Sequence, residues 1–281
     1  MEVGRCHPVI RRSERRRTSA SLLLAAVFAL GASVGASAQA ARGAQVPDTR
    51  TPRVISPIDL TGYWVSVVTE DWRFRMIVPD KGDYASVPIT AEGRKVADTW
   101  DPSKDQASGN QCKSYGAAAL MRVPGRLHIS WDNDNTLRVD TDSGTQTRLF
   151  HFGGMAPQGM AADWQGYSVA SWEGLPLRPV FVGPGQENGE GKAPEGYLKV
   201  MTTHLRPGYL RKNGVPYSAN AVLEEYFDSF KEQNGDTWLV VTTIVTDPQY
   251  LILPFVTSSH FKKLSGAVGW DPTPCRADEP R

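Results

Sequence analysis

The chain has 281 residues, of which 40% are hydrophobic and 22% are charged, and its 31 Lys and Arg against 30 Asp and Glu give a formal charge of +1. These values are typical of globular proteins and exclude collagen-like, coiled-coil and wholly disordered chains. Proteins that bind nucleic acids usually have a strongly basic composition, so this charge predicts no nucleic-acid partner.

The N-terminus has the features of a secretory signal peptide. The basic segment RRSERRR precedes an apolar run, SLLLAAVFALGASVGASA, that ends at Ala36-Ser37-Ala38. This order predicts a signal peptide over residues 1–38, cleavage near Gln39, and a periplasmic or secreted protein with no membrane attachment after cleavage. The alternative is an uncleaved membrane anchor, since about 20 apolar residues can span a bilayer. The twin arginines are not followed by a full Tat consensus, so the sequence leaves the choice between the Sec and Tat export routes open.

Two cysteines follow the predicted cleavage site, Cys112 and Cys275. An even number of cysteines in an oxidising compartment predicts a disulfide between them. The alternative is a pair of free thiols. Neither cysteine has the His and Cys spacing of a zinc site, so the sequence predicts no structural metal.

The rest of the chain has the pattern of a β-rich protein. A Pro-rich segment predicts a linker over 39–58, and a single domain over 59–281 follows it. Alternating or β-branched runs in that domain predict about ten strands. They cover residues 62–69, 71–78, 126–131, 136–141, 145–152, 166–172, 197–205, 222–230, 238–246 and 255–263.

The connections predict how these strands pair. Turn-forming residues such as DNDN at 132–135 indicate hairpins and therefore an antiparallel meander. Because closure removes exposed edges, we expect an all-β fold in which the meander closes into a barrel of about 8–10 strands. The segment PITAEGRKVADTW predicts one short helix capped by Thr90, and 101–120 and 175–196 are expected to be irregular loop insertions.

Two motifs resemble known proteins. Thr61-Gly62-Tyr63-Trp64 resembles the G-x-W opening of lipocalin (calycin) barrels, and the segment 246–250, TDPQY, is similar to their T-D-Y turn. The stretch WQGYSVASWEG is similar to a motif of a large group of secreted bacterial proteins, W-x-G-H-S-x-x-x-W-E-G, which is followed there by E-R-F. Tyr167 replaces the motif histidine and Tyr226 replaces the arginine. The resemblance implies a lipocalin-like barrel and no established activity.

Charged residues on strands are candidates for a site inside the barrel. In the predicted strand DWRFRMIV, alternation places Arg73 and Arg75 on the face opposite Trp72. Both arginines point into the barrel if the aromatic face points outward, and both are solvated in the alternative orientation. Glu225 alternates with apolar Leu223 and predicts an inward carboxylate with a raised pKa or a partner such as Arg75 or Arg148.

Histidines are the candidate general bases. Four follow the signal peptide, and all are expected on strands: His128, His151, His204 and His260. An inward histidine, with Glu225 as a further candidate, can act in catalysis, whereas a structural or solvated histidine is the alternative. We take His128, His204 and His260 as the catalytic candidates. Ser258 lies two residues before His260, but no Gly-x-Ser-x-Gly elbow supports a serine hydrolase.

Aromatic residues are the candidate ligand contacts. Trp164, Tyr167 and Trp172 can form an aromatic wall, and core packing is the alternative. The full set of predicted ligand contacts is Trp64, Arg73, Arg75, Arg148, Trp164, Tyr167, Trp172, Glu173 and Tyr209. Tyr209 belongs to the basic, Gly/Pro-rich segment 206–218, which is predicted to be a lid, an anion-binding patch or a plain hairpin loop.

These features lead to three functional hypotheses. The preferred one is an exported lipocalin-like barrel that binds a small apolar or aromatic molecule in its interior. The second is a cofactor-free lyase, isomerase or hydrolase on the same barrel, and the third is a protein-interaction module. No phosphate-binding loop, dinucleotide fingerprint or HExxH motif is present, so no cofactor is predicted.

Overall fold

The computed structural model describes residues 50–174 and 196–279. The predicted signal peptide, the first part of the predicted linker, and residues 175–195 of the second predicted insertion lie outside the described residues.

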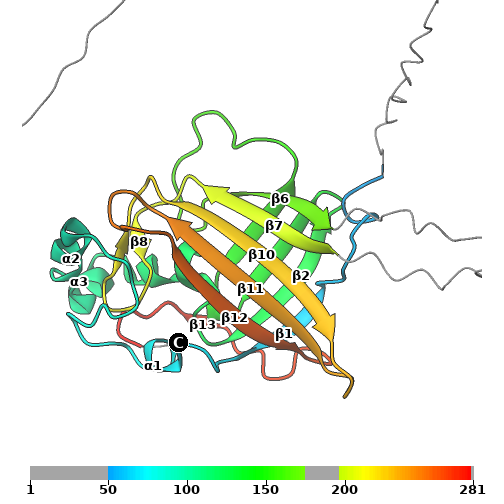
Figure 1. Ribbon diagram of the computed structural model, residues 1–281, viewed down its shortest axis with the longest axis horizontal. Helices are drawn as coiled ribbons and strands as arrows, with labels where there is room; N and C mark the ends of the chain where they lie inside the picture. Colours follow the sequence, from blue (N-terminus) through cyan, green and yellow to red (C-terminus); the bar gives the residue numbers. More distant parts are fainter. Residues whose placement is uncertain (1–49, 175–195, 280–281) are drawn as a thin grey trace, which may run out of the picture. The chain divides into compact units, whose positions relative to one another are not determined.

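Nine strands form one closed β-barrel (Figure 1). They are β1 (Gly62–Val67), β2 (Arg126–Asn133), β3 (Thr136–Thr141), β5 (Thr147–Phe152), β6 (Tyr167–Gly174), β7 (Gly196–Thr203), β10 (Val222–Lys231), β11 (Thr237–Thr246) and β12 (Phe255–Lys263). Their order around the ring is β1-β12-β11-β10-β7-β6-β5-β3-β2, and β2 pairs with β1 to close it. The predicted all-β barrel is confirmed.

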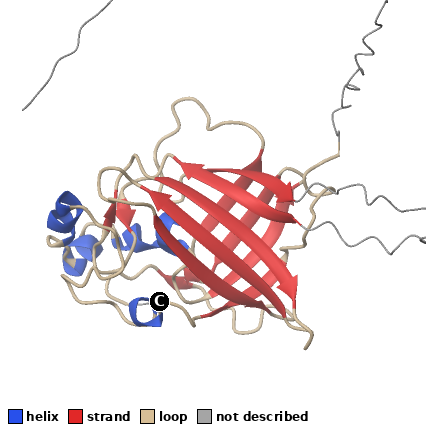
Figure 2. Cartoon of the chain, viewed as in Figure 1, coloured by secondary structure: helices blue, strands red, loops and turns tan. Residues whose placement is uncertain are grey.

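Short helices and two small ribbons complete the described part of the chain. The helices are α1 (Trp72–Arg75), α2 (Ala91–Ala97), α3 (Pro102–Ala107), a 3₁₀ helix η1 (Gln111–Tyr115) and α4 (Ala117–Leu120). One ribbon pairs β4 (Ser143–Gly144) with β13 (Thr273–Pro274), and the other pairs β8 (Gly208–Tyr209) with β9 (Pro216–Tyr217). Figure 2 shows the helices gathered at one end of the barrel, which we call the closed end.

One pair of neighbouring barrel strands is parallel. β5 and β6 pair in parallel through Phe150 and Ser168, whereas every other neighbouring pair in the ring is antiparallel. Lipocalin barrels have eight strands in an up-and-down order. This barrel therefore differs from a lipocalin in strand number and in one strand direction.

The prediction of a strand at 71–78 is wrong. The segment forms the single-turn helix α1, in which the amide of Met76 donates to the carbonyl of Trp72 at 2.7 Å. Asp71 before it has φ of +55°, a left-handed conformation that ends the extended chain. β1 already has β12 and β2 as neighbours, so the closed ring has no position for another strand beside it.

Local capping residues explain the helices at the closed end. Thr90 Oγ1 accepts from the amide of Gly93 at 3.0 Å, which confirms the predicted cap of α2. The insertion predicted to be irregular at 101–120 contains α3, η1 and α4 instead. Asp101 caps α3 through the amide of Ser103, and Pro102 occupies the first helical position, where it is well tolerated.

Alternate strand positions fill the barrel interior. Trp64, Phe150, Leu198 and Phe227 each have an exposed fraction of 0%. A side chain with no accessible surface has no water-sized space beside it, so this layer of the interior is close-packed.

The disulfide between Cys112 and Cys275 is present, as predicted. It joins η1 to the segment after β13 across a sequence separation of 163 residues. Closing a loop of this length stabilises a fold by roughly 4–5 kcal/mol in the chain-entropy account. The bond therefore fastens the C-terminal segment to the closed end.

The end of the barrel opposite the helices is lined by the segment before β1, and we call it the mouth. The indole nitrogen of Trp172 donates to the carbonyl of Pro52 at 2.8 Å, and the amide of Arg53 donates to the carbonyl of Asp134. Ile58 packs against the barrel core. The described part of the predicted linker thus packs on the barrel.

Candidate functional site

The three histidines predicted to be catalytic do not point into the barrel. His128 and His260 lie at half-buried strand positions between inward neighbours that are buried, so both point outward. His204 follows β7 and is exposed, with φ of +57°. The prediction of an inward histidine is therefore wrong for each of these three.

Two of these histidines have partners on the outer face. His128 stacks on Tyr63 with 4.2 Å between ring centroids, and Trp270 packs edge-on to Tyr63. His260 lies 3.3 Å from Ser258 Oγ and 3.2 Å from the Glu70 carboxylate, an order that resembles a Ser-His-acid row. Glu70 also holds the buried guanidinium of Arg75, so this row ties α1 to the barrel wall.

Glu225 is inward, as alternation predicted, and it pairs with Arg148. Both side chains have no exposed surface, and the two contacts measure 3.0 Å and 2.5 Å. Arg148 Nη2 also donates to Thr202 Oγ1, which contacts Ser168 Oγ at 2.8 Å. The network lies next to Phe150 and Phe227, on the side nearer the closed end. It is a bidentate pair without open space around it.

The predicted aromatic wall of three residues is not assembled. Trp172 lies among the inward residues of β6, whereas Tyr167 faces outward and stacks on His151 at 4.8 Å. Trp164 lies in the connection before β6 and packs under the guanidinium of Arg206, 4.3 Å from its ring centroid. Of the three residues, only Trp172 reaches the barrel mouth.

The remaining predicted contacts also have structural partners. Trp64 donates its indole N–H to the carbonyl of Leu60 in the core. Glu173 accepts from the hydroxyl of Tyr197 at 3.1 Å, on the outer face of the barrel. Tyr209 donates to Asp105 at 2.8 Å, and burial raises the pKa of its hydroxyl.

The aromatic rings of Trp131, Phe152 and Trp172 meet at the mouth. Of these, the sequence analysis named only Trp172 as a ligand contact. Phe152 lies 5.5 Å from Trp131 and 5.2 Å from Trp172, measured between ring centroids. A cavity of about 310 Å³ adjoins this cluster and is lined by Trp131, Leu137 and Trp172 and by the segment before β1. Period-two alternation along β2 and β5 places Trp131 and Phe152 inward. This alternation is the sequence feature from which the two residues could have been predicted as inward aromatic residues.

Most of the segment 206–218 is buried: Arg206 and Pro207 are exposed, and residues 208–218 form the packed hairpin of β8 and β9. Leu210, Val215 and Tyr217 are at most 1% exposed, and the β8–β9 ribbon packs with α2 and η1 at the closed end. Lys212 in its turn donates to the hydroxyl of Tyr115 at 2.6 Å and to the carbonyl of Glu279. Burial lowers the pKa of Lys212 to about 7.

No protein family, curated protein or solved structure matches this chain. Within residues 50–174 and 196–279, no helix is long and apolar enough to cross a membrane. The same residues contain no cluster of three His, Cys, Asp or Glu side chains suited to a metal ion.

The Arg148–Glu225 pair leads to a stability prediction with a matched control. Glu225→Gln leaves a buried guanidinium without its counter-charge, and we expect the free energy of unfolding to fall by roughly 3–5 kcal/mol. Glu224→Gln changes the neighbouring half-exposed carboxylate, which contacts Lys199, and is expected to cost about 1 kcal/mol or less. Urea unfolding measures both values, and equal losses would contradict the buried pair's role.

Lys212 leads to a prediction about pH. An unfolded lysine keeps its proton up to about pH 10.4, whereas folded Lys212 loses it near pH 7. The unfolded state therefore binds more protons between pH 7 and 9.5, and stability is expected to rise with pH by up to about 1.4 kcal/mol per unit.

The matched variants isolate this contribution. Lys212→Met should remove the rise, whereas Lys104→Met changes an exposed lysine and should keep it. Urea unfolding at several pH values gives the slope of the unfolding free energy against pH. The same slope in the unchanged protein and in both variants would show that Lys212 does not cause the rise.

Proposed function

We propose that this protein is an exported, lipocalin-like barrel that binds a small aromatic or apolar molecule at its mouth. The observation that carries the proposal is the meeting of Trp131, Phe152 and Trp172 beside a cavity of about 310 Å³. Ligand pockets typically have volumes of about 300–1,000 Å³ and are lined mainly by aromatic and apolar groups.

Because the barrel interior is packed, the mouth is a better candidate binding site than the centre of the barrel. Side chains such as Phe150 and Phe227 leave no water-sized space around them, so a ligand there would have to displace core residues. At the mouth, Arg53, Asp59 and Thr61 add polar groups at the rim of the aromatic cavity. Such groups orient a ligand whose body contacts the rings.

The positions of the candidate bases favour binding over catalysis. A general base must lie within hydrogen-bond reach of the proton it removes. His128 and His260 are on the outer face, and Glu225 is closed in by Arg148. These groups do not share a cavity with the aromatic cluster.

The binding proposal predicts a loss of affinity on removal of one ring. N-Phenyl-1-naphthylamine, a neutral aromatic fluorophore, should bind with a rise in its fluorescence, and Trp172→Ala should weaken that binding about tenfold or more. Trp172→Phe loses the hydrogen bond to Pro52 but keeps an aromatic ring. It should therefore bind the fluorophore more tightly than Trp172→Ala does.

The control is Trp72→Ala, which removes an exposed tryptophan from α1. This variant should bind the fluorophore as the unchanged protein does. An equal loss in Trp72→Ala and Trp172→Ala, or no binding by the unchanged protein, would argue against the mouth as the site.

The Cys112–Cys275 disulfide supports the export part of the proposal, because such bonds persist in oxidising compartments. Expression of the full chain in a Gram-negative host should yield periplasmic or secreted protein whose N-terminus lies near Gln39. Mass spectrometry of the intact protein and of its non-reduced peptides measures both the cleavage site and the Cys112–Cys275 linkage. Uncleaved protein in the membrane fraction would favour the anchor alternative.

A further inference from the structure

Four polar side chains form one row on the outer face of the barrel, where β1 leads towards α1. Ser258 and His260 point outward from β12, and Thr69 and Glu70 lie in the connection between β1 and α1. His260 Nε2 lies 3.3 Å from Ser258 Oγ, and His260 Nδ1 lies 3.4 Å from Thr69 Oγ1. The hydroxyl of Thr69 donates to the Glu70 carboxylate at 3.0 Å. The side chain of His260 is 34% exposed, so solvent reaches the row.

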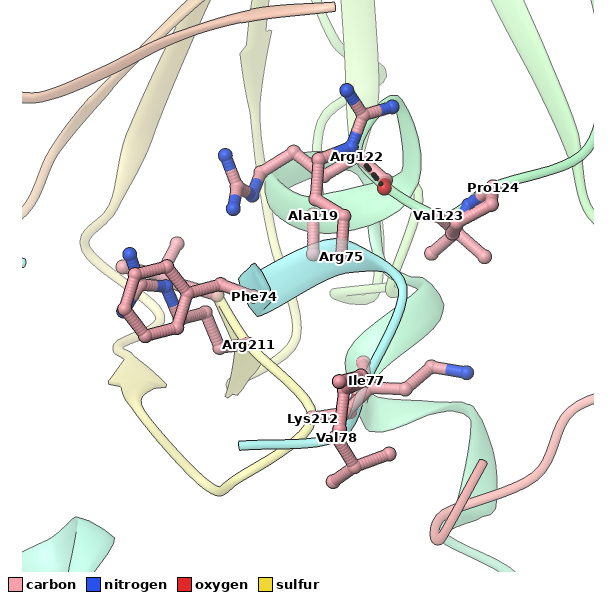
Figure 3. A pocket seen from close by; sticks show the side chains of 12 residues that line it. Phe74, Arg75, Ile77, Val78, Ala119, Arg122, Val123, Pro124, Arg211 and Lys212 are labelled. Atoms are coloured by element: carbon pink, nitrogen blue, oxygen red, sulfur yellow. Dashed lines mark hydrogen bonds between the residues drawn. The ribbon is translucent and has the colours of Figure 1, made fainter. Parts of the chain in front are cut away.

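The charge of Glu70 fixes the direction of the hydrogen bonds in this row. Glu70 pairs with Arg75, whose side chain is buried and whose Nε donates to the carbonyl of Arg122 at 2.9 Å (Figure 3). Beside this guanidinium Glu70 is an ionised carboxylate, which only accepts hydrogen bonds. It takes the single proton of the Thr69 hydroxyl, so Thr69 Oγ1 accepts a hydrogen bond from the Nδ1–H of His260.

His260 is therefore oriented as a base towards Ser258. A neutral imidazole with its proton on Nδ1 has no proton on Nε2, so the hydroxyl of Ser258 donates to Nε2. When the ring takes up that proton, the Glu70 carboxylate, 3.2 Å from Nδ1, stabilises the positive charge. Serine, histidine and carboxylate have the same order in the triads of serine hydrolases. The serine here lies on a strand and not at a Gly-x-Ser-x-Gly elbow.

The same spacing elsewhere in the barrel does not produce such a row. His128 and Ser130 are also two residues apart, and both point outward from β2. The ring of His128 stacks on Tyr63, and no hydrogen bond joins it to Ser130 among the residues that the structure describes. The orientation of His260 therefore depends on its partners between β1 and α1, and Ser130 is a matched control for Ser258.

The surface beside Ser258 is apolar and has one further hydroxyl. Val256, the next outward residue of β12, is 58% exposed, and Val240 lies opposite His260 on β11. These side chains offer contacts to the apolar part of a substrate. Thr242 lies opposite Ser258 and supplies a hydroxyl on the same face. One such donor stabilises an oxyanion less than the set of donors in a typical oxyanion hole, so the site suits esters with a good leaving group and not amides.

We propose that Ser258 is a nucleophile that hydrolyses small aryl esters, with His260 as its general base. Ser258 Oγ attacks the carbonyl carbon of the ester, and its proton passes to His260 Nε2. The bond from that carbon to the phenol oxygen then breaks, and the phenol leaves with the proton. Water attacks the acylated serine in the same way, which releases the carboxylic acid and restores Ser258. This activity is independent of ligand binding at the mouth.

Labelling of the folded protein with a fluorophosphonate tests the nucleophile. The reagent phosphonylates an activated serine with loss of fluoride, and mass spectrometry of the peptides should place the adduct on Ser258. Ser258→Ala should abolish the adduct, and His260→Gln should slow its formation about a hundredfold. Ser130→Ala should be labelled at the same rate as the unchanged protein. No adduct on the unchanged protein, or an adduct on Ser130, would overturn the proposal.

Hydrolysis of p-nitrophenyl butyrate measures the proposed reaction directly. The unchanged protein should release p-nitrophenol at least about tenfold faster than Ser258→Ala does, and it should not cleave the matching p-nitroanilide. Trp172→Ala should keep full hydrolysis, because it alters only the mouth. Equal rates in the unchanged protein and in Ser258→Ala would overturn the proposal, and so would loss of hydrolysis in Trp172→Ala.

Variants of Thr69, a positioning residue, separate catalysis from a purely structural role of the row. Thr69→Val keeps the shape of the side chain but breaks the link from His260 to Glu70, and it should slow the labelling of Ser258 about tenfold. Thr69→Ser keeps the hydroxyl and should restore the rate of the unchanged protein. Because Thr69 is exposed, neither variant should lower the unfolding temperature. Equal labelling rates in Thr69→Val and Thr69→Ser would overturn the assigned direction of the hydrogen bonds.

Discussion

The direction of strands cannot alternate around a closed ring that contains an odd number of them. A nine-stranded barrel must therefore include at least one parallel pair, and here the pair is β5 and β6. Parallel neighbours end at the same side of a sheet, so Phe152 and Trp172 come to the mouth next to each other. The aromatic cluster follows from this pairing.

The same constraint shapes the closed end. The connection from β5 to β6 has to return along the barrel, and its last residues reach the helices. The amide of Ala117 donates to the carbonyl of Trp164 at 2.9 Å, and Gln165 donates to the carbonyl of Tyr115 at 2.8 Å. The returning chain thus anchors η1 and α4. The aromatic cluster at the mouth and the helices at the closed end thus both contact segments that this parallel pair positions.

Sequence reasoning predicted the strands well because their signal is local. Nine of the ten predicted runs are barrel strands, and alternation placed Glu225 inward beside its arginine. The same rule failed at 71–78, where the amino-acid pattern suits a strand but the ring has no free position for one. Propensity is a weak guide where tertiary structure offers no partner.

The candidate sites were harder to predict than the strands because they depend on long-range placement. Trp131 and Phe152 were visible as aromatic strand residues, but only strand order brings them to Trp172. Lys212 lies in the connection between β8 and β9, where no periodicity indicates burial. The basic, Gly/Pro-rich segment 206–218 was compatible with a lid, an anion-binding patch or a hairpin loop, and the sequence does not show that its β8–β9 hairpin packs at the closed end.

Closure of the barrel also affects the rate of folding. β1 pairs with β12 on one edge and β2 on the other, so the first and last barrel strands of the chain meet at a seam. Contacts between the two ends of a domain form at a high entropic cost and tend to slow folding. Until β1 enters the seam, β12 and β2 each present an unpaired edge of the kind that promotes association between chains.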